Sequence, residues 1–223
     1  MTCKSYIGRA NINIYHGDCM EFMKDKPAKS YDLAICDPPY GIGLDVWDKE
    51  IPSNIYFDYL FDKTQEQFIF GGNYFQLPHT QGWICWDKSF NEYLRGKSLS
   101  KSKIKKENIS EFELIWTSKL KKSKFIRFMN LGNLQGFDDN IKVDYTKQSK
   151  IHICEKPVQI YKLLLTNYAK AGDKILDTHG GSMSIAIACW DLGFDLDIIE
   201  LDKDYYDKAV QRFERHINQK QIF

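Results

Sequence analysis

The sequence predicts an α/β protein with a doubly wound, mostly parallel sheet. Short apolar segments that suit buried strands alternate along the chain with segments in which apolar residues recur at helical spacing. One predicted strand, over 174–177, is followed by a glycine-containing loop and by a helix of small residues over 185–192. A loop of this kind at the carboxyl end of a parallel strand is typical of nucleotide-cofactor sites.

Length and composition indicate one ordinary globular domain spanning 1–223. The chain has 223 residues, a hydrophobic content of 43% and a formal net charge of +1. The amino terminus lacks an apolar signal segment, and no apolar run approaches the ~20 residues of a membrane span. We therefore expect a cytoplasmic protein without a membrane association. The six cysteines are scattered without metal-ligand spacing, so no metal site is predicted.

The first predicted strand covers 11–15 and ends at a Gly-Asp pair, before a short helix that runs through Lys24. Asp18 has the residue type and the place of a helix N-cap. It also puts a carboxylate at the edge of the sheet, where it can accept from the amino group of an adenosine. The sequence leaves both roles open.

The next strand, over 33–36, ends abruptly at Asp37-Pro38-Pro39-Tyr40. Proline fixes its own φ and restricts the residue before it, so this loop is held extended. Two prolines also remove two N–H donors, which leaves a carboxylate, backbone carbonyls and an aromatic ring. This combination suits a planar ring that carries an amino group, and a rigid turn at the end of a strand is the alternative.

The amino nitrogen of adenine or cytosine is a poor nucleophile, because its lone pair is delocalised into the ring. Acceptance of its two hydrogens, by the Asp37 carboxylate and the Pro38 carbonyl, would favour a pyramidal nitrogen with a localised lone pair. Tyr40 would hold the base by stacking after the base has left the duplex.

The middle of the chain continues the alternation. A helix that carries Ile55, Tyr59, Leu60 and Phe61 is expected within 44–66, and a strand over 68–70 follows it. Two aromatic-rich segments, 83–86 and 112–116, read as further strands, and the pattern from 118 to 150 is irregular.

A basic sector lies between Arg95 and Arg127. It contains eleven Lys or Arg and three Glu, a net charge of +8 on a chain whose total is +1. A basic sector on an otherwise acidic body predicts contact with nucleic acid, and a solvated lysine-rich loop is the alternative. The predicted nucleic-acid residues are Arg95, Lys97, Lys101, Lys103, Lys105, Lys106, Lys121, Lys122 and Lys124.

The last third contains the elements of a cofactor site. Pro157 suits the first turn of a helix over 158–169, and Gly172 suits its end. After the glycine loop, a strand over 197–201 places Glu200 23 residues beyond Asp177. An acid near this spacing can accept both hydroxyls of a ribose. The final helix buries one apolar stripe.

The Asp-Pro-Pro-Tyr strand, the glycine loop and the acid after it together resemble the S-adenosylmethionine-dependent amino-methyltransferases of DNA. The adenine-N6 group is the better match, because the cytosine-N4 group more often carries Ser at the first position. The resemblance implies a Rossmann-like methyltransferase fold with a circularly permuted motif order, the catalytic strand preceding the cofactor strand. It also implies a small target-recognition region within 95–150 and a cofactor-binding half over 151–223.

The resemblance assigns roles to individual residues. Asp37, Pro38, Pro39 and Tyr40 are the predicted catalytic residues. The predicted cofactor-binding residues are Asp18, Cys19, Lys156, Asp177, Thr178, His179, Gly181, Ser182, Glu200 and Leu201. Two residues depart from the family pattern of the loop: His179 stands where Phe is common, and Met183 stands where a glycine is common. Met183 would narrow the pocket unless its side chain turns into the core.

These observations predict a DNA methyltransferase that moves the methyl group of S-adenosyl-L-methionine to N6 of an adenine flipped out of duplex DNA. The alternatives are a cytosine-N4 enzyme of the same fold and a catalytically weak relative that binds cofactor or DNA. The sequence leaves open whether the protein forms a homodimer and whether a restriction nuclease accompanies it.

Overall fold

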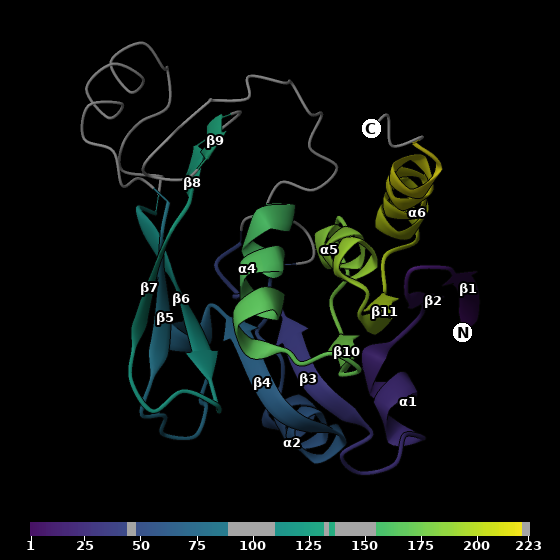
Figure 1. Cartoon of the computed structure of the whole chain (residues 1–223). Coiled ribbons are helices and arrows are strands. Elements are labelled where there is room, and N and C mark those ends of the chain that lie inside the picture. The colour runs from purple at the N-terminus through teal and green to yellow at the C-terminus, as the bar shows by residue number, and fades with distance from the viewer. Residues whose placement is uncertain (44–47, 89–109, 132–133, 137–154, 220–223) are drawn as a thin grey trace.

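The computed structural model describes residues 1–43, 48–88, 110–131, 134–136 and 155–219. Among them is a nine-stranded sheet with the order β1-β2-β11-β10-β3-β4-β6-β5-β7 (Figure 1). Its strands are β1 (Thr2–Ile7), β2 (Asn11–His16), β3 (Tyr31–Cys36), β4 (Thr64–Phe70), β5 (Trp83–Asp87), β6 (Phe112–Thr117), β7 (Lys124–Arg127), β10 (Lys174–Asp177) and β11 (Asp195–Glu200). The hairpin strands β8 (Met129–Leu131) and β9 (Leu134–Gly136) pair with each other. The helices are α1 (Cys19–Lys24), α2 (Asn54–Lys63), α4 (Val158–Tyr168), α5 (Ser184–Leu192) and α6 (Lys203–Asn218), with a 3₁₀ turn η1 (Gly72–Tyr74).

The centre of the sheet is parallel, β1 and β6 run against it, and the edge strand β7 pairs parallel with β5. β2, β11, β10, β3 and β4 all run in the same direction. β1 pairs antiparallel with β2 at one edge, and β6 pairs antiparallel with β4 and β5 toward the other edge. Since helices connect β3 to β4 and β10 to β11, parallel neighbours arise through crossovers, as in doubly wound folds. The predicted fold class is confirmed.

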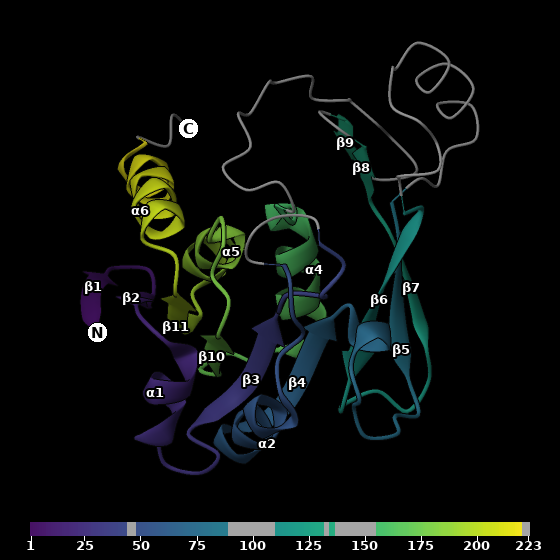
Figure 2. The same cartoon turned by 180° about the vertical axis from the view of Figure 1, so that it is seen from behind.

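Helices cover both faces of the sheet (Figures 1 and 2). α4, α5 and α6 pack on one face, against side chains such as Ile12, Leu33 and Ile175. α1 and α2 pack on the other face, against side chains such as Ala34 and Ile69. The parallel strands are therefore buried on both sides, and this explains why their sequences are continuous apolar runs without strict alternation.

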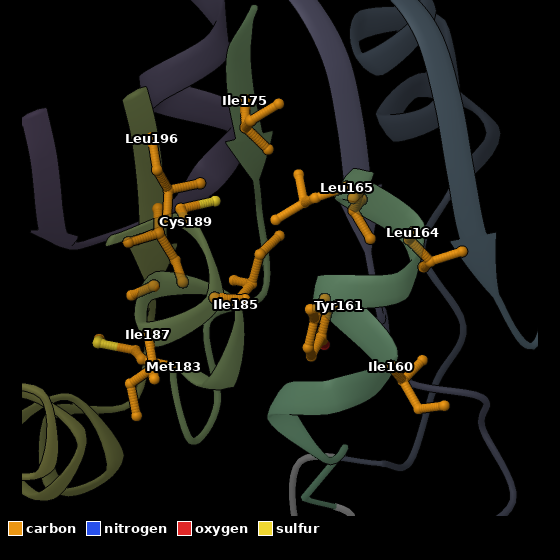
Figure 3. Close-up of a cluster of buried hydrophobic side chains, with 14 of the residues drawn as sticks. Ile160, Tyr161, Leu164, Leu165, Ile175, Met183, Ile185, Ile187, Cys189 and Leu196 are labelled. Atoms are coloured by element: carbon orange, nitrogen blue, oxygen red, sulfur yellow. The ribbon is translucent and has the colours of Figure 1, made fainter. Parts of the chain in front are cut away.

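Figure 3 shows the core around α4 and α5, in which Met183 lies beside Ile187 on the side of α5 away from α4. Met183 is fully buried and adopts a left-handed backbone conformation with φ 56° at the start of α5. This conformation costs a non-glycine residue on the order of 1–3 kcal/mol, and burial of the thioether side chain offsets the cost. The methionine that stands in place of the common glycine therefore fills part of the core.

Helix α2 packs on the sheet through a largely aromatic face. Tyr56, Phe57 and Leu60 are the buried residues of α2, whereas Ile55 is 60% exposed. Two neighbouring aromatic residues, which bury more apolar area than an isoleucine, define the face that packs on the sheet. The structure also contains two edge strands that sequence analysis missed, β1 and β7, whose residues are mostly exposed. Of the helices in the described ranges, none has the length and apolar character needed to cross a membrane.

Candidate active site

A cavity of about 840 Å³ opens at the carboxyl ends of four parallel strands. Asp37 follows β3, Thr178 follows β10, Glu200 ends β11 and Gly17 follows β2, and all four line the cavity. The four predicted catalytic residues line it, and so do nine of the ten predicted cofactor residues: Asp18, Cys19, Lys156, Thr178, His179, Gly181, Ser182, Glu200 and Leu201. Segments more than 100 residues apart in the chain thus meet at one site, as the permuted motif order requires.

The Asp-Pro-Pro-Tyr loop offers no free backbone N–H to the cavity. Pro38 and Pro39 have none, and the next two N–H groups are both donated to one carboxylate oxygen. Asp48 Oδ1 accepts from the Tyr40 N–H at 2.7 Å and from the Gly41 N–H at 2.9 Å. Asp48 is only 1% exposed, so the loop is held by a buried carboxylate. The acceptor-only backbone that the two prolines predict is present.

Both oxygens of the Asp37 carboxylate have a partner within the site. The Tyr40 hydroxyl donates to Oδ1 at 2.7 Å, and Lys156 Nζ donates to Oδ2 at 2.7 Å. Lys156 comes from the segment before α4 and its side chain is 6% exposed. The lysine that the sequence assigns to the cofactor contacts the carboxylate that the sequence predicts to be catalytic.

The Tyr40 ring is fixed from behind. It stacks on Tyr74 with 4.9 Å between ring centroids and an interplanar angle of 10°. A Cβ at Gly71 would lie 2.3 Å from the Tyr40 ring, and Gly71 has φ 64°, so both space and backbone require glycine there. Tyr40 lines the cavity and Tyr74 does not. Tyr40 therefore contributes to the cavity wall, whereas Tyr74 supports its ring from outside the cavity.

Asp177 is the one predicted cofactor residue that does not line the cavity. It lies beneath the glycine loop, where Oδ1 accepts from the His179 N–H at 3.0 Å. Burial is the main cause that raises the pKa of Asp177 to about 8. Burial also lowers the pKa of His179 to about 4, so the imidazole is neutral near pH 7. Asp177 therefore shapes the loop from below.

This arrangement predicts a pH dependence of stability. Folded Asp177 keeps its proton up to about pH 8, whereas an unfolded Asp loses it near the ordinary value of 3.8. The folded state binds more protons in this window, so the free energy of unfolding falls as pH rises through it. His179 acts in the opposite direction only between its folded pKa of about 4 and its ordinary value of 6.5. Between about pH 6.5 and 8 the effect of Asp177 is therefore not opposed by His179.

We expect the urea midpoint of the protein to fall between about pH 6.5 and 8, and the Asp177→Asn variant to lose much of that fall. Asparagine keeps an oxygen that can accept from the His179 N–H, so the loop contact is retained. Chemical denaturation at the two pH values measures the difference. Equal pH dependence in both proteins would contradict a buried, protonated Asp177.

Glu200 holds the glycine loop to the end of β11. Its Oε2 accepts from the Gly181 N–H at 2.6 Å, and its Oε1 accepts from the Asp202 N–H at 2.8 Å. Burial raises the pKa of Glu200 above its ordinary value, although these N–H groups act against burial. The carboxylate lines the cavity, and each of its oxygens retains a lone pair for a ligand.

Helix α6 takes part in the site, which sequence analysis missed. Arg212 donates to the Ser182 carbonyl at 2.9 Å and pairs with Glu155 at 2.9 Å. One guanidinium thereby ties the glycine loop to the segment that carries Lys156. The cavity is also lined by residues at the start of α6 that were not predicted: Asp202, Lys203, Asp204, Tyr205 and Lys208. A polar helix start carries no local pattern that would have distinguished these residues from a solvated surface.

Asp18 is the N-cap of α1 and also lines the cavity, and its contact with an adenosine amino group stays a prediction. Its carboxylate caps α1 by accepting from the Met20 N–H at 2.7 Å, and the residue lines the cavity together with Cys19. Leu201 lines the cavity although it is 68% exposed. An exposed leucine at a polar site gives a planar ligand an apolar surface.

The predicted nucleic-acid residues are only partly described. Arg95, Lys97, Lys101, Lys103, Lys105 and Lys106 lie outside the described residues. Lys121 and Lys122 are exposed in the turn between β6 and β7. Since the Ser118 N–H donates to the Gln67 carbonyl, this turn lies toward the amino end of β4, away from the cavity (Figure 1). Lys124 begins β7 and lines a shallow depression beside Phe125.

Comparison with known proteins gives one family. The model of the DNA methylase family N6_N4_Mtase matches residues 60–211. The Type II methyltransferase M.HpaI of Haemophilus parainfluenzae is 23% identical over 239 residues, which cover 90% of this chain and 74% of that protein. The Type II methyltransferase M.ScaI of Streptomyces caespitosus is 40% identical over only 40 residues, 18% of this chain and 13% of that protein.

Solved structures share the fold. The complex of M1.HpyAVI with SAM has a TM-score of 0.56 at 20% identity, covering 90% of this chain and 99% of that one. The cytosine-N4-specific PvuII DNA methyltransferase has a TM-score of 0.57 at 14% identity, covering 93% and 90%. The family match spans more than half of the chain and includes α4, the glycine loop and β11. The chain belongs to the N6/N4 DNA methylase family.

Proposed function

We propose that the protein transfers a methyl group from S-adenosyl-L-methionine to N6 of an adenine in duplex DNA. One observation carries the proposal: the Asp37 carboxylate, on a loop without free N–H groups, lines the same cavity as the glycine loop and Glu200. A site for an amino group and a site for a nucleoside cofactor are thereby combined. The family membership and the names of the relatives support the same activity.

The residues present fit the cofactor. The Glu200 carboxylate suits the ribose hydroxyls, Asp18 suits the adenosine amino group, and Leu201 gives an apolar contact for the purine. A cavity of about 840 Å³ is in the upper part of the range of small-molecule sites, roughly 300–1,000 Å³, so it is large enough to hold a base beside the cofactor. When bound, S-adenosylmethionine supplies an electrophilic methyl group on a positively charged sulfur.

The chain itself prepares the nucleophile. Asp37 and the Pro38 carbonyl accept the hydrogens of the target amino group, so the nitrogen lone pair is localised and directed away from the ring. The charge of Asp37 also stabilises the positive charge that develops on this nitrogen. Tyr40, held from behind by Tyr74, stacks on the extruded base.

Adenine is favoured over cytosine because position 37 is Asp, as in the adenine group that the loop resembles. Cytosine N4 is the second candidate. The same acceptors fit its amino group, and a cytosine-N4-specific enzyme is among the structures with this fold.

The DNA would be held by groups outside the described cavity. We assign DNA binding to the basic sector, which lies within the region over 95–150 that also contains the target-recognition residues. We assign cofactor binding to the half over 151–223. The proposed protein is thus one methyltransferase domain over 1–223. Its proposed partner is duplex DNA.

Cofactor binding tests the role of Glu200. Glu200→Ala removes the charged acceptor for the ribose hydroxyls and the anchor of the Gly181 N–H, so we expect a loss of roughly 1.5–3 kcal/mol in cofactor affinity. Isothermal titration calorimetry with S-adenosylmethionine measures this loss. DNA affinity, measured by fluorescence anisotropy, is expected to change little and is the internal control. A variant that binds cofactor normally and DNA poorly would contradict the assignment.

A further inference from the structure

Four charged side chains form a chain that leads from the cavity into the protein. Lys156 Nζ lies 2.7 Å from Asp37 Oδ2 and 3.4 Å from Glu113 Oε2. Lys88 Nζ lies 2.8 Å from Glu113 Oε1. Asp37 and Lys156 line the cavity, whereas Glu113 and Lys88, from β6 and the end of β5, lie behind it. Glu113 is thus joined to the site by its ion pair with Lys156.

Lys156 Nζ lies closer to the Asp37 carboxylate than to the Glu113 carboxylate. Lys156 donates a hydrogen bond to Asp37 at 2.7 Å, whereas its ion pair with Glu113 is longer, at 3.4 Å. Glu113 Oε2 is a buried atom that has no hydrogen-bond partner among the described residues. Burial alone would raise the pKa of Glu113, but Lys156 and Lys88 outweigh it and hold that pKa below its ordinary value. Glu113 is therefore a charged acceptor with an unused oxygen.

In the proposed reaction, the target amino group and Lys156 compete for the same Asp37 carboxylate. The target nitrogen needs Asp37 as an acceptor and becomes more positive during methyl transfer. An ammonium group hydrogen-bonded to the same carboxylate competes for it and repels the developing charge. Movement of Lys156 away from Asp37 when the base enters would remove both the competition and the repulsion.

We propose that Glu113 is a positioning residue that accepts Lys156 from Asp37 when the target base enters, which frees Asp37 Oδ2 for the amino group. The inference rests on the proposed function. A charge-assisted hydrogen bond is about 2.8 Å long, so a shift of roughly 0.6 Å from the present 3.4 Å separation is enough. The rings of Tyr40 and Phe70, 5.5 and 5.3 Å from Nζ, stabilise the ammonium in this space. Lys88 keeps Glu113 in place from the other side.

The variant Glu113→Gln tests the inference. The amide has no charge to attract Lys156, so Lys156 stays on Asp37. We expect kcat for methylation of duplex genomic DNA to fall roughly 10- to 100-fold, the value of one hydrogen bond to a charged group, with the KM for S-adenosylmethionine unchanged. Glu111→Gln is the matched control, because it makes the same change at an exposed position of the same segment. The control is expected to keep the activity of the natural protein.

The background of Lys156→Met separates positioning from a merely structural effect. If Glu113 acts through Lys156, adding Glu113→Gln to Lys156→Met causes no further loss of kcat. An equal loss in both backgrounds, or normal activity of Glu113→Gln, would overturn the inference. Because Glu113→Gln leaves Lys88 without its carboxylate, the pair Glu113→Gln/Lys88→Met is a second variant without an unmatched charge, and the same loss is expected of it.

The outcomes distinguish the two proposals. A natural protein that transfers no methyl group to DNA would overturn the proposed function and this inference with it. An active natural protein whose Glu113 variants are equally active would overturn the inference alone.

Discussion

Replacement of Asp37 by alanine is expected to lower the rate of DNA methylation by about 10²- to 10³-fold, by analogy with the loss of one hydrogen-bonding group that stabilises developing charge. Asp37 is the carboxylate of the Asp-Pro-Pro-Tyr loop and lines the cavity, where it would provide both the acceptor and the negative charge. Single-turnover transfer of a labelled methyl group to duplex DNA measures the effect on the chemical step.

Two comparisons keep this result interpretable. Asp37→Asn preserves the size of the side chain and one acceptor oxygen but removes the charge, so it is expected to lie between the natural protein and Asp37→Ala. Cofactor affinity is expected to survive in both variants, because the glycine loop and Glu200 are unchanged. If Asp37→Ala loses cofactor binding to the same degree as activity, then Asp37 has a structural role.

The second large effect is expected from Tyr40→Ala. Loss of an aromatic platform costs about 1–3 kcal/mol per stacked base, which is about 5- to 150-fold in activity. The alanine also leaves Tyr74 without its stacking partner and removes the hydrogen bond to Asp37 Oδ1. Methylation of duplex DNA and binding to a duplex with a mismatch opposite the target measure the loss.

Tyr40→Phe separates these contributions. It keeps the ring and the stack on Tyr74 but removes the hydroxyl that donates to Asp37. Appreciable activity of Tyr40→Phe and of Tyr40→Trp is expected if stacking dominates. Equal losses in Tyr40→Phe and Tyr40→Ala would assign the role to the hydroxyl. A mismatch opposite the target is expected to tighten binding, because less pairing must be broken.

Local sequence patterns predicted the parts of the site that depend on neighbouring residues. Two prolines after an apolar run predicted the acceptor-only loop, and strand, glycine loop and helix predicted the cofactor edge. In both cases the backbone conformation follows from residue types within about ten positions. The sequence allowed two positions for the Met183 side chain, in the pocket or in the core. The structure places it in the core.

The contacts that sequence analysis missed are those that distant segments make. Asp48 holds the Tyr40 and Gly41 N–H groups, yet a single aspartate in a loop has no pattern that marks it. Glu113 and Lys88 meet because β5 and β6 pair antiparallel, a register that periodicity cannot give. Arg212 donates to the carbonyl of Ser182, which lies 30 residues earlier in the chain. The sequence pattern of α6 indicates only an amphipathic helix that packs on the sheet.

The identity of the methylated base tests the assignment most directly. Duplex DNA without prior methylation is incubated with the protein and S-adenosylmethionine that carries a labelled methyl group, digested to nucleosides and analysed by mass spectrometry, with Asp37→Ala as the control. We predict labelled N6-methyladenine with the natural protein and a strong reduction with the control. Labelled N4-methylcytosine would contradict the choice of adenine, and the absence of any labelled base despite bound cofactor would contradict DNA methylation itself.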